Sequence, residues 1–433
     1  MNQTREDMTV RLERAVLVSV ALPSRPWAGD DPLDELRGLA ETAGARIVGE
    51  LTQKRQDIVP GTYIGKGKLG ELNELVEAKD AEVVIFDNDL SPAQVRNLEK
   101  TTNAKVIDRS ELILDIFATR ARTIESKLQV ELAQLEYALP RLKRMWTHLS
   151  RYKGGIGLRG PGETQLEEDR RLVGLKIRDL KERLRHVQAR KQREVSSRFE
   201  EHTVSLVGYT NAGKSTLMNR LTGAGVYVED KLFSTLDTRT RQWRLRDWGR
   251  ILLSDTVGFI RDLPHHLVAS FKATLEEARQ ARLLLHVVDA SNPHAEEHIL
   301  AVKKVLKELD CDSRPTLLVL NQIDRLTDLS YLQVLQAHHP RAVAVSAFTG
   351  AGIDALEDAV IAMLSADFLQ VSIDLDAGNG RVLAYLAAHA DIQRQEFYDN
   401  RVKMFGSLPR YLLRHIQEPG VVVEEVRANG VAD

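Results

Sequence analysis

Apolar residues change their spacing from one region of the chain to the next. Over residues 1–110, short apolar runs alternate with segments in which apolar residues recur every three or four positions. The runs are typical of buried parallel strands, and the second spacing is typical of helices. Strands are expected at 15–22, 46–51, 82–87 and 104–108, and helices at 33–44, 68–79 and 91–100. This alternation predicts a small N-terminal α/β subdomain with a parallel sheet.

From about residue 111 to 200, leucines recur at alternating spacings of four and three, which is the pattern of a helix seam. One seam starts at Leu128 and a second starts at Leu166. Residues 153–164, between them, hold five glycines and a proline and cannot be helical. We therefore expect an antiparallel helical hairpin over 111–200, with a Gly-rich basic tip at 153–164. Pro140 should kink the first helix or end it near Leu139.

The remaining chain alternates again. Residues 202–365 predict a mostly parallel sheet with helices on both faces. Residues 366–433 predict a small C-terminal α+β domain, with strands at 369–375, 401–406 and 421–426 and a helix at 381–390. The fold class expected for the whole chain is therefore α/β.

The residues GYTNAGKS at 208–215 come directly after an apolar run at 203–207. This is the G-x-x-x-x-G-K-[ST] pattern in a strand–loop–helix context. Backbone N–H groups of such a loop, with the helix N-terminus behind it, cradle phosphate oxygens. Lys214 is expected to reach the β- and γ-phosphates, and Ser215 to bind Mg²⁺. A lone Gly-rich loop is often only a tight turn, so the prediction depends on motifs found later in the chain.

Two further elements complete a phosphate and Mg²⁺ site. Thr235 is the candidate for a threonine that ligates Mg²⁺ only while the γ-phosphate is present, with Thr238 and Thr240 as rivals. The strand at 250–255 leads into DTVG, where Asp255 would hold Mg²⁺ through a water. The Gly258 N–H would contact the γ-phosphate.

A strand at 316–320 leads into NQID, which we interpret as a base-reading element. The Asp324 carboxylate can accept hydrogen bonds from N1–H and N2–H₂ of guanine, whereas adenine offers an acceptor at N1. The Ser346–Ala347 backbone, within a run at 342–348, would support the guanine carbonyl. The ligand is therefore expected to be GTP or GDP, and residues 202–365 a GTPase domain of the translation-factor-like type.

The nucleotide-binding residues expected from these elements are Gly208, Tyr209, Thr210, Asn211, Ala212, Gly213, Lys214, Ser215, Thr216, Phe233, Ser234, Thr235, Leu236, Asp237, Asp255, Thr256, Val257, Gly258, Asn321, Gln322, Ile323, Asp324, Ser346, Ala347 and Phe348. Of these, Lys214, Thr235, Gly258 and Asn211 are the candidates for direct roles in catalysis.

Three residues bear on rate and affinity. Gln322 stands where a Lys usually packs over the loop and the ribose, which suggests weaker nucleotide affinity. Phe259 stands where many GTPases have a water-orienting Gln, so hydrolysis is expected to be slow without outside help. Asn211 either binds a K⁺ ion beside the phosphates or serves only turn geometry.

Charge is distributed very unevenly. The whole chain carries a net charge of −2, but residues 141–193 hold 16 Lys and Arg against 6 Asp and Glu, an excess of ten positive charges. A basic helix face is often simply solvated, yet this excess surrounds a slim tip that could enter a nucleic-acid crevice. The residues expected to bind RNA are Arg151, Lys153, Gly157, Arg159, Gly160 and Gly162.

The single cysteine, Cys311, excludes an intrachain disulfide and fits a reducing cytoplasm. No apolar run approaches the length of a membrane span. We therefore expect a cytoplasmic protein with no membrane partner, which is a monomer when free.

The segment GGIGLRGPGETQLEEDRR at 154–171, together with GYTNAGKST and DTVGF further along the chain, resembles the HflX family of ribosome-associated GTPases. The resemblance spans about residues 10–365. It implies that the large ribosomal subunit is the partner and that the tip reaches toward the peptidyl-transferase region. It also implies that the GTP-bound protein helps split or rescue stalled ribosomes under stress. Ser215 and Thr235 match the family's Mg²⁺ ligands, and Gln322 departs from the family pattern.

Two alternatives stay open at this point. Phe259 and Gln322 are also compatible with a nucleotide-gated RNA-binding module that has negligible turnover. A GTPase that serves RNA modification or protein signalling would carry the same nucleotide motifs.

Overall fold

A computed structural model describes residues 13–27, 31–141, 165–196, 202–223, 232–233, 235–236, 238–246, 248–261, 276–311, 313–365, 368–409, 413, 416 and 418–426. The chain divides into two compact units. The first contains residues 1–244 and 249–353, and the second contains residues 245–248 and 354–433. Within the described helices, none is long and apolar enough to cross a membrane.

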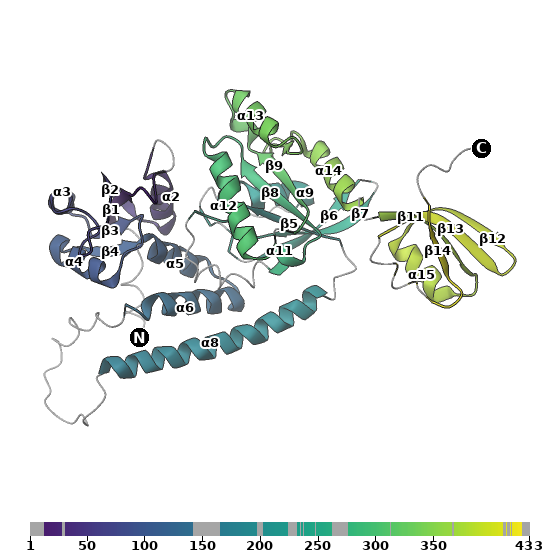
Figure 1. Cartoon of the computed structure of the whole chain (residues 1–433), viewed down its shortest axis with the longest axis horizontal. Helices are drawn as coiled ribbons and strands as arrows, with labels where there is room; N and C mark the ends of the chain where they lie inside the picture. Colours follow the sequence, from purple (N-terminus) through teal and green to yellow (C-terminus); the bar gives the residue numbers. More distant parts are fainter. Residues whose placement is uncertain are drawn as a thin grey trace. The chain divides into compact units, whose positions relative to one another are not determined.

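The first unit begins with a four-stranded parallel sheet in the order β2-β1-β3-β4 (Figure 1). Its strands are β1 (Arg14–Ala21), β2 (Arg46–Lys54), β3 (Val83–Phe86) and β4 (Lys105–Asp108). Its helices are α2 (Asp34–Ala43), α3 (Lys66–Lys79), α4 (Pro92–Thr102) and α5 (Arg109–Arg120). The elements predicted for residues 1–110 are all present, and apolar side chains are buried on both faces of this sheet.

Local sequence signals account for how these elements begin and end. Helix α4 starts with a capping box, in which the Ser91 hydroxyl accepts from the Gln94 backbone N–H and the Gln94 side chain accepts from the Ser91 N–H. Pro92 occupies the first helical position, where no N–H is needed. Helix α5 begins directly after β4 with no intervening loop, and Asp108 is its N-cap.

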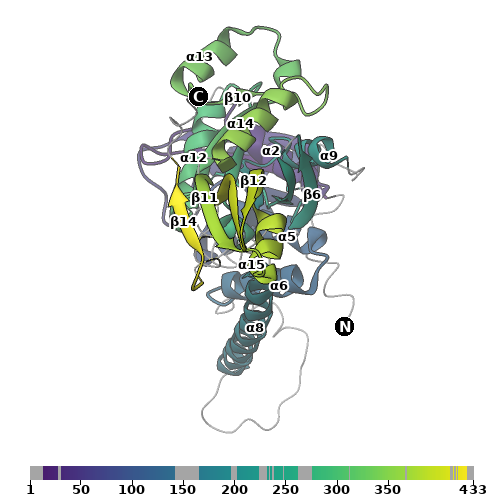
Figure 2. The same ribbon diagram turned by 90° about the vertical axis from the view of Figure 1, so that its right-hand side faces the viewer.

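Two long helices, α6 (Ile124–Ala138) and α8 (Gln165–Ser196), lie side by side in Figures 1 and 2. Leu132 of α6 packs with Ile177, Leu180 and Leu184 of α8, so the two predicted seams cover each other. Helix α6 ends at Ala138 with Leu139 as its C-cap, which agrees with the effect expected of Pro140. We call this pair of helices the arm.

The third part of the first unit is a six-stranded sheet in the order β10-β9-β8-β5-β7-β6. Its strands are β5 (Thr203–Gly208), β6 (Arg239–Leu245), β7 (Gly249–Asp255), β8 (Leu283–Asp289), β9 (Thr316–Asn321) and β10 (Val343–Ala344). Its helices are α9 (Lys214–Thr222), α11 (Glu276–Gln280), α12 (Ala295–Glu308) and α13 (Ser330–His338), with a 3-10 turn, η1 (Ile323–Arg325). The carboxyl ends of β5, β7 and β9 carry the candidate nucleotide-binding residues, as expected for an open parallel sheet.

The second unit contains α14 (Ile353–Ser365) and an antiparallel sheet in the order β12-β13-β11-β14. Its strands are β11 (Phe368–Asp376), β12 (Asp391–Tyr398), β13 (Arg401–Pro409) and β14 (Val422–Glu425). Helix α15 (Gly380–His389) packs on one side of this sheet, as Figure 2 shows. Strand β12 was not predicted.

Candidate nucleotide site

The loop between β5 and α9 has the backbone conformation that a phosphate cradle needs. Gly213 has φ +82°, and a Cβ there would lie 2.4 Å from Asn321 Nδ2. Only glycine therefore allows the loop to approach the base-reading segment so closely. Asn211 has φ +62°, a left-handed conformation that Asn tolerates better than most residues. This conformation is consistent with the turn-geometry interpretation of Asn211 and does not test the K⁺ interpretation.

Lys214 is positioned by the carbonyl groups of its own loop. Its Nζ donates to Gly208 O at 3.1 Å and to Tyr209 O at 2.8 Å, and its side chain is buried. Burial lowers the pKa of Lys214 to about 8, and the nearby Asp255 carboxylate acts against that shift. The ammonium is therefore held over the loop at the position where an anionic ligand would stabilise its charge.

Three oxygen-bearing side chains converge beside Lys214. Ser215 Oγ donates to Asp255 Oδ2 at 2.5 Å and lies 2.8 Å from Thr235 Oγ1. Thr235 Oγ1 also donates to Asp255 Oδ2, at 3.4 Å. The other carboxylate oxygen, Asp255 Oδ1, is buried and has no hydrogen-bond partner among the described residues. Burial raises the pKa of Asp255, and Lys214 opposes that shift.

Hydroxyl and carboxylate oxygens are the ligands that Mg²⁺ takes in proteins, and an unsatisfied buried carboxylate oxygen is what a cation or its bound water would satisfy. The residues present therefore fit a Mg²⁺ ion. Of the rival threonines, Thr240 donates instead to Glu277 Oε2 at 3.0 Å and lies 3.0 Å from Ser254 Oγ. The geometry favours Thr235 over Thr240.

The base-reading segment is fixed to the phosphate loop by two amide side chains. Asn321 Nδ2 donates to Ala212 O at 2.9 Å, and Gln322 Nε2 donates to Asn211 O at 3.0 Å. Gln322 thus packs over the loop at the place that a Lys stem usually takes in this motif. Beside them, Ser346 Oγ donates to Asp324 Oδ1 at 2.5 Å, which orients the carboxylate.

The Ala347 N–H donates to Asn321 Oδ1 at 3.0 Å. From α9, Arg220 Nε donates to Ala347 O at 3.0 Å, and the same guanidinium bonds Phe348 O. Arg220 was not predicted from the sequence, because nothing in its surroundings along the chain indicates that its guanidinium meets a loop more than a hundred positions away.

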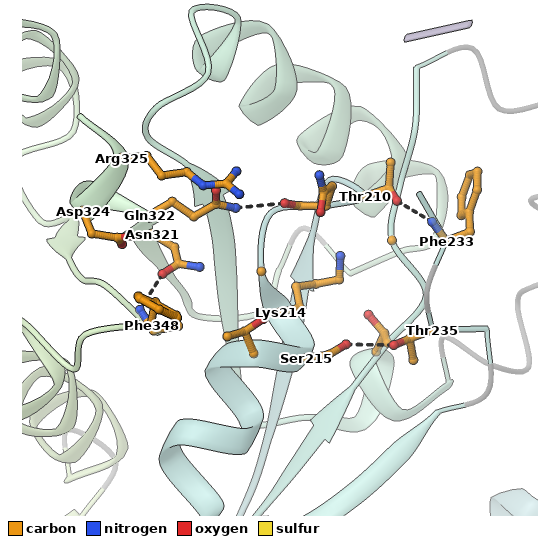
Figure 3. Close-up of a pocket in the computed structure, with 16 residues that line it drawn as sticks. Thr210, Lys214, Ser215, Phe233, Thr235, Asn321, Gln322, Asp324, Arg325 and Phe348 are labelled. Atoms are coloured by element: carbon orange, nitrogen blue, oxygen red, sulfur yellow. Dashed lines mark hydrogen bonds between the residues drawn. The ribbon is translucent and has the colours of Figure 1, made fainter. Parts of the chain in front are cut away.

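These elements surround one cavity of about 510 Å³. In Figure 3, Lys214, Ser215 and Thr235 lie toward one end, and Asp324, Arg325 and Phe348 lie toward the other. The lining residues are Thr210, Asn211, Gly213, Lys214, Ser215, Thr216, Phe233, Thr235, Thr256, Gly258, Asn321, Gln322, Asp324, Arg325, Ala347 and Phe348. The volume lies in the range of pockets that take a small organic ligand.

Comparison with known proteins decides the family. Residues 30–118 match a family model described as GTP-binding GTPase N-terminal, and residues 120–198 match one described as GTP-binding GTPase Middle Region. Residues 203–322 match a model described as 50S ribosome-binding GTPase. The GTPase HflX of Escherichia coli K12 is 50% identical over 373 residues, which is 86% of this chain and 87% of that protein.

The chain belongs to the HflX family of GTPases. The GTPase HflX of Magnetococcus marinus is 46% identical over 399 residues, covering 90% of this chain and 92% of the relative. A crystal structure of a GTP-binding protein from Sulfolobus solfataricus in complex with GDP aligns with a TM-score of 0.45 at 22% identity. The alignment covers 82% of this chain and 99% of the Sulfolobus solfataricus chain. The family matches confirm the predicted resemblance and the GTPase activity. The parallel strands of the two sheets in the first unit confirm the α/β fold.

Several residues predicted to bind the nucleotide do not line the cavity of this HflX-family GTPase. The structure does not place Gly208, Tyr209, Ala212, Leu236, Asp255, Val257, Ile323 and Ser346 in the lining, and Ser234 and Asp237 fall outside the described part of the chain. Arg325 lines the cavity and was missed. Its place directly after NQID was the available signal.

The residue after Gly258 does not face the ligand. Phe259 is buried in the core, while its backbone N–H donates to Gly208 O at 3.0 Å and its carbonyl accepts from Thr210 N at 2.7 Å. These two bonds connect the DTVG segment directly to the phosphate loop. The phenylalanine is therefore a packing residue, and no hydrogen bond from its side chain can orient a water.

The residues predicted to bind RNA lie within or beside the predicted tip at 153–164. Arg151, Lys153, Gly157, Arg159, Gly160 and Gly162 lie outside the described residues, so their role stays a prediction.

Proposed function

We propose that this HflX-family GTPase is a GTP-driven switch that binds the large ribosomal subunit and helps split or rescue stalled ribosomes. The observation that carries the proposal is the match of residues 203–322 to a family of 50S ribosome-binding GTPases, in a chain whose residues 141–193 carry an excess of ten positive charges. Phosphate-rich RNA is the natural partner of such a basic segment. The protein would act in the cytoplasm, where ribosomes are found.

In this proposal the cavity holds guanine at Asp324 and the phosphates at the β5–α9 loop. Lys214 contacts the β- and γ-phosphates, and the Gly258 N–H contacts the γ-phosphate. A Cβ at position 258 would lie 2.8 Å from Thr210 Cα, so glycine keeps this backbone close to the phosphate loop. Ser215 and Thr235 would ligate Mg²⁺, and Asp255 would hold it through a water. When bound, Mg²⁺ supplies positive charge to the phosphate oxygens.

Hydrolysis by the protein alone is expected to be slow, because Phe259 is buried and supplies no group to the attacking water. Its stimulation would then come from the ribosome or from a K⁺ ion held at Asn211. Single-turnover hydrolysis in K⁺ and in Na⁺ separates these sources. Equal rates in the two salts would exclude the K⁺ role.

The central test is GTP turnover with and without purified large subunits, together with light scattering of 70S ribosomes after addition of the protein and a non-hydrolysable GTP analogue. We expect stimulation of turnover and a fall in scattering as subunits separate. Unchanged turnover across a titration of subunits would contradict the ribosomal assignment.

Arg159→Ala tests the arm in the same assays. The substitution should weaken binding to large subunits in sedimentation while basal turnover stays at the wild-type level, because the tip is far along the chain from the nucleotide motifs. Equal loss of both activities would indicate misfolding, which a thermal melt would detect.

A further inference from the structure

The side chain of Tyr209, the second residue of the phosphate loop, is directed away from the nucleotide cavity. Its hydroxyl donates to Glu35 of α2 and accepts from the backbone N–H of Arg261 at 2.7 Å. Its ring stacks on His298 of α12, with centroids 3.8 Å apart and planes 5° apart. A residue of the phosphate loop is thus tied to the N-terminal subdomain and to the segment that comes after Gly258.

The same segment is held a second time, by Arg109. Its Nη2 donates to Arg261 O at 3.1 Å and to Glu35 Oε2 at 2.5 Å, and its Nη1 donates to Asp87 Oδ1 at 2.7 Å. Arg109 is 2% exposed, so these bonds form in a low-dielectric setting where charge-assisted hydrogen bonds are strong. Both backbone polar groups of Arg261 are therefore bound by this cluster, three residues after the glycine proposed to contact the γ-phosphate.

The residue before Arg109 holds the arm. Asp108 is fully buried and accepts from Tyr137 Oη at 2.7 Å and from Arg141 Nη2 at 3.0 Å. The Arg141 guanidinium lies 3.4 Å above the centre of the Tyr137 ring. Tyr137 is in the last turn of α6, so this cluster fixes the C-terminal end of the arm's first helix to the N-terminal subdomain.

Asp108 and Arg109 are consecutive, at a junction where strand β4 passes straight into helix α5. Asp108 also caps α5, accepting from the Glu111 N–H at 3.0 Å. The two side chains of the junction make five hydrogen bonds of 2.5–3.1 Å, to Arg261, Glu35, Asp87, Tyr137 and Arg141. A shift of the segment at Arg261 cannot leave this junction's hydrogen bonds intact.

We propose that the Asp108–Arg109 junction transmits the nucleotide state from the segment after Gly258 to the arm. The inference rests on the proposed function only in taking the γ-phosphate as the ligand of the Gly258 N–H. When hydrolysis removes that contact, the Arg261 backbone moves relative to Tyr209 and Arg109, and the junction passes the change to Tyr137 and Arg141. Coupling of this kind is reciprocal, so a macromolecule that binds the arm also changes nucleotide affinity.

The test is amide hydrogen exchange on the full chain, without ribosomes, in saturating GDP and in a saturating non-hydrolysable GTP analogue with Mg²⁺. In the wild-type protein we expect the exchange rates of peptides covering α6 to differ between the two states by on the order of tenfold. In Tyr209→Phe, which keeps the ring but removes both hydroxyl bonds, the difference should fall below about twofold. The matched control is Tyr331→Phe, which removes a tyrosine hydroxyl bond to Pro293 O in the same unit and should leave the difference unchanged.

Glu35→Gln is the second variant, because it lies outside the phosphate loop. It removes the negative charge that contacts both Tyr209 and Arg109. If Tyr209→Phe binds nucleotide too weakly to saturate, the exchange difference in α6 of Glu35→Gln tests the proposal instead. A full wild-type difference in α6 in either saturated variant would overturn the proposal. So would a wild-type protein that binds both nucleotides and shows no difference in α6. Since ribosomes are absent, neither result depends on the ribosomal assignment.

Discussion

The phosphate loop has an inner side, which faces the nucleotide cavity, and an outer side, which faces the N-terminal subdomain. Different neighbours constrain the residues on the two sides. On the inner side, Gly213, Lys214 and Ser215 offer the close backbone, the cation and the hydroxyl that phosphate and Mg²⁺ would require. On the outer side, Tyr209 is dictated by its neighbours Glu35 and His298. An eight-residue motif therefore specifies what the loop binds, while one of its variable positions specifies what the loop is attached to.

The largest effect is expected on the inner side, from Lys214→Ala. GTP turnover should fall by on the order of 10²–10³-fold, since the buried ammonium stabilises the negative charge that develops on the phosphate oxygens. Phosphate release at saturating GTP measures the change, and Lys79→Ala, at an exposed position of α3, is the control. Turnover within a factor of about two of wild type would show that another group supplies the charge.

On the outer side, Arg109→Met should lower the free energy of unfolding by about 3 kcal/mol. The substitution removes the buried cation that lies 2.5 Å from the Glu35 carboxylate and 2.7 Å from the Asp87 carboxylate, although Glu35 keeps a longer, 3.5 Å pair with Arg261. Urea denaturation measures the change. The control is Arg14→Met, which breaks the half-exposed pairs with Asp80 and Glu82 and should cost less than about 1 kcal/mol. Equal losses in both variants would mean that burial adds nothing to the Arg109 cluster.

Base recognition is the next contrast within the cavity. Asp324→Asn should weaken GTP binding by on the order of 100-fold, because the amide cannot accept two hydrogen bonds from the guanine edge. Xanthine carries a carbonyl in place of the guanine amino group, so xanthosine triphosphate should bind the variant better than GTP does. Competition against a fluorescent GDP measures both. The control is Asp328→Asn, because within the described part of the chain the Asp328 carboxylate accepts only from the exposed Ser330. This variant should change neither the GTP affinity nor the xanthosine triphosphate affinity.

The smallest expected effect is on pH dependence. Burial lowers the pKa of Lys214 to about 8 in the free protein, and bound phosphates raise it. Above pH 8 the free protein has lost this proton and must regain it on binding, so GDP affinity should fall as pH rises through 8, by at most about tenfold per unit. Below pH 8 the affinity should be flat. Calorimetry at pH 7, 8 and 9 measures the slope, and Lys214→Arg should remove it because arginine does not titrate there.

The sequence named the residues of the loop that line the cavity, and it did so for a physical reason, while their binding of nucleotide stays a prediction. Ligand chemistry constrains residues that are adjacent in the chain, such as those from Gly208 to Ser215, and it constrains the strand ends that present them. The seams of the arm were predictable for a similar reason, because helical geometry brings regularly spaced leucines onto one face.

The outer side could not be predicted, because its partners are brought together only by the tertiary fold. Arg109 and Arg261 are separated by 152 positions and have no common local pattern. Strand β12 was missed because its apolar residues do not alternate, although the two-residue turn at Asp399 and Asn400 before β13 was an available hairpin signal. Arg220 was missed for the same reason as Arg109: a guanidinium gives no local sign of which distant backbone it will reach.

The absence of a loop between β4 and α5 has a consequence for how this chain can vary. Asp108 is extended and Arg109 is the first helical residue, so the backbone changes conformation between them and the two side chains face different neighbours while sharing one peptide bond. A single inserted residue would rotate one of them out of its cluster. We therefore expect this site to reject the insertions and circular permutations that exposed turns accept, such as the one at Asp399 and Asn400.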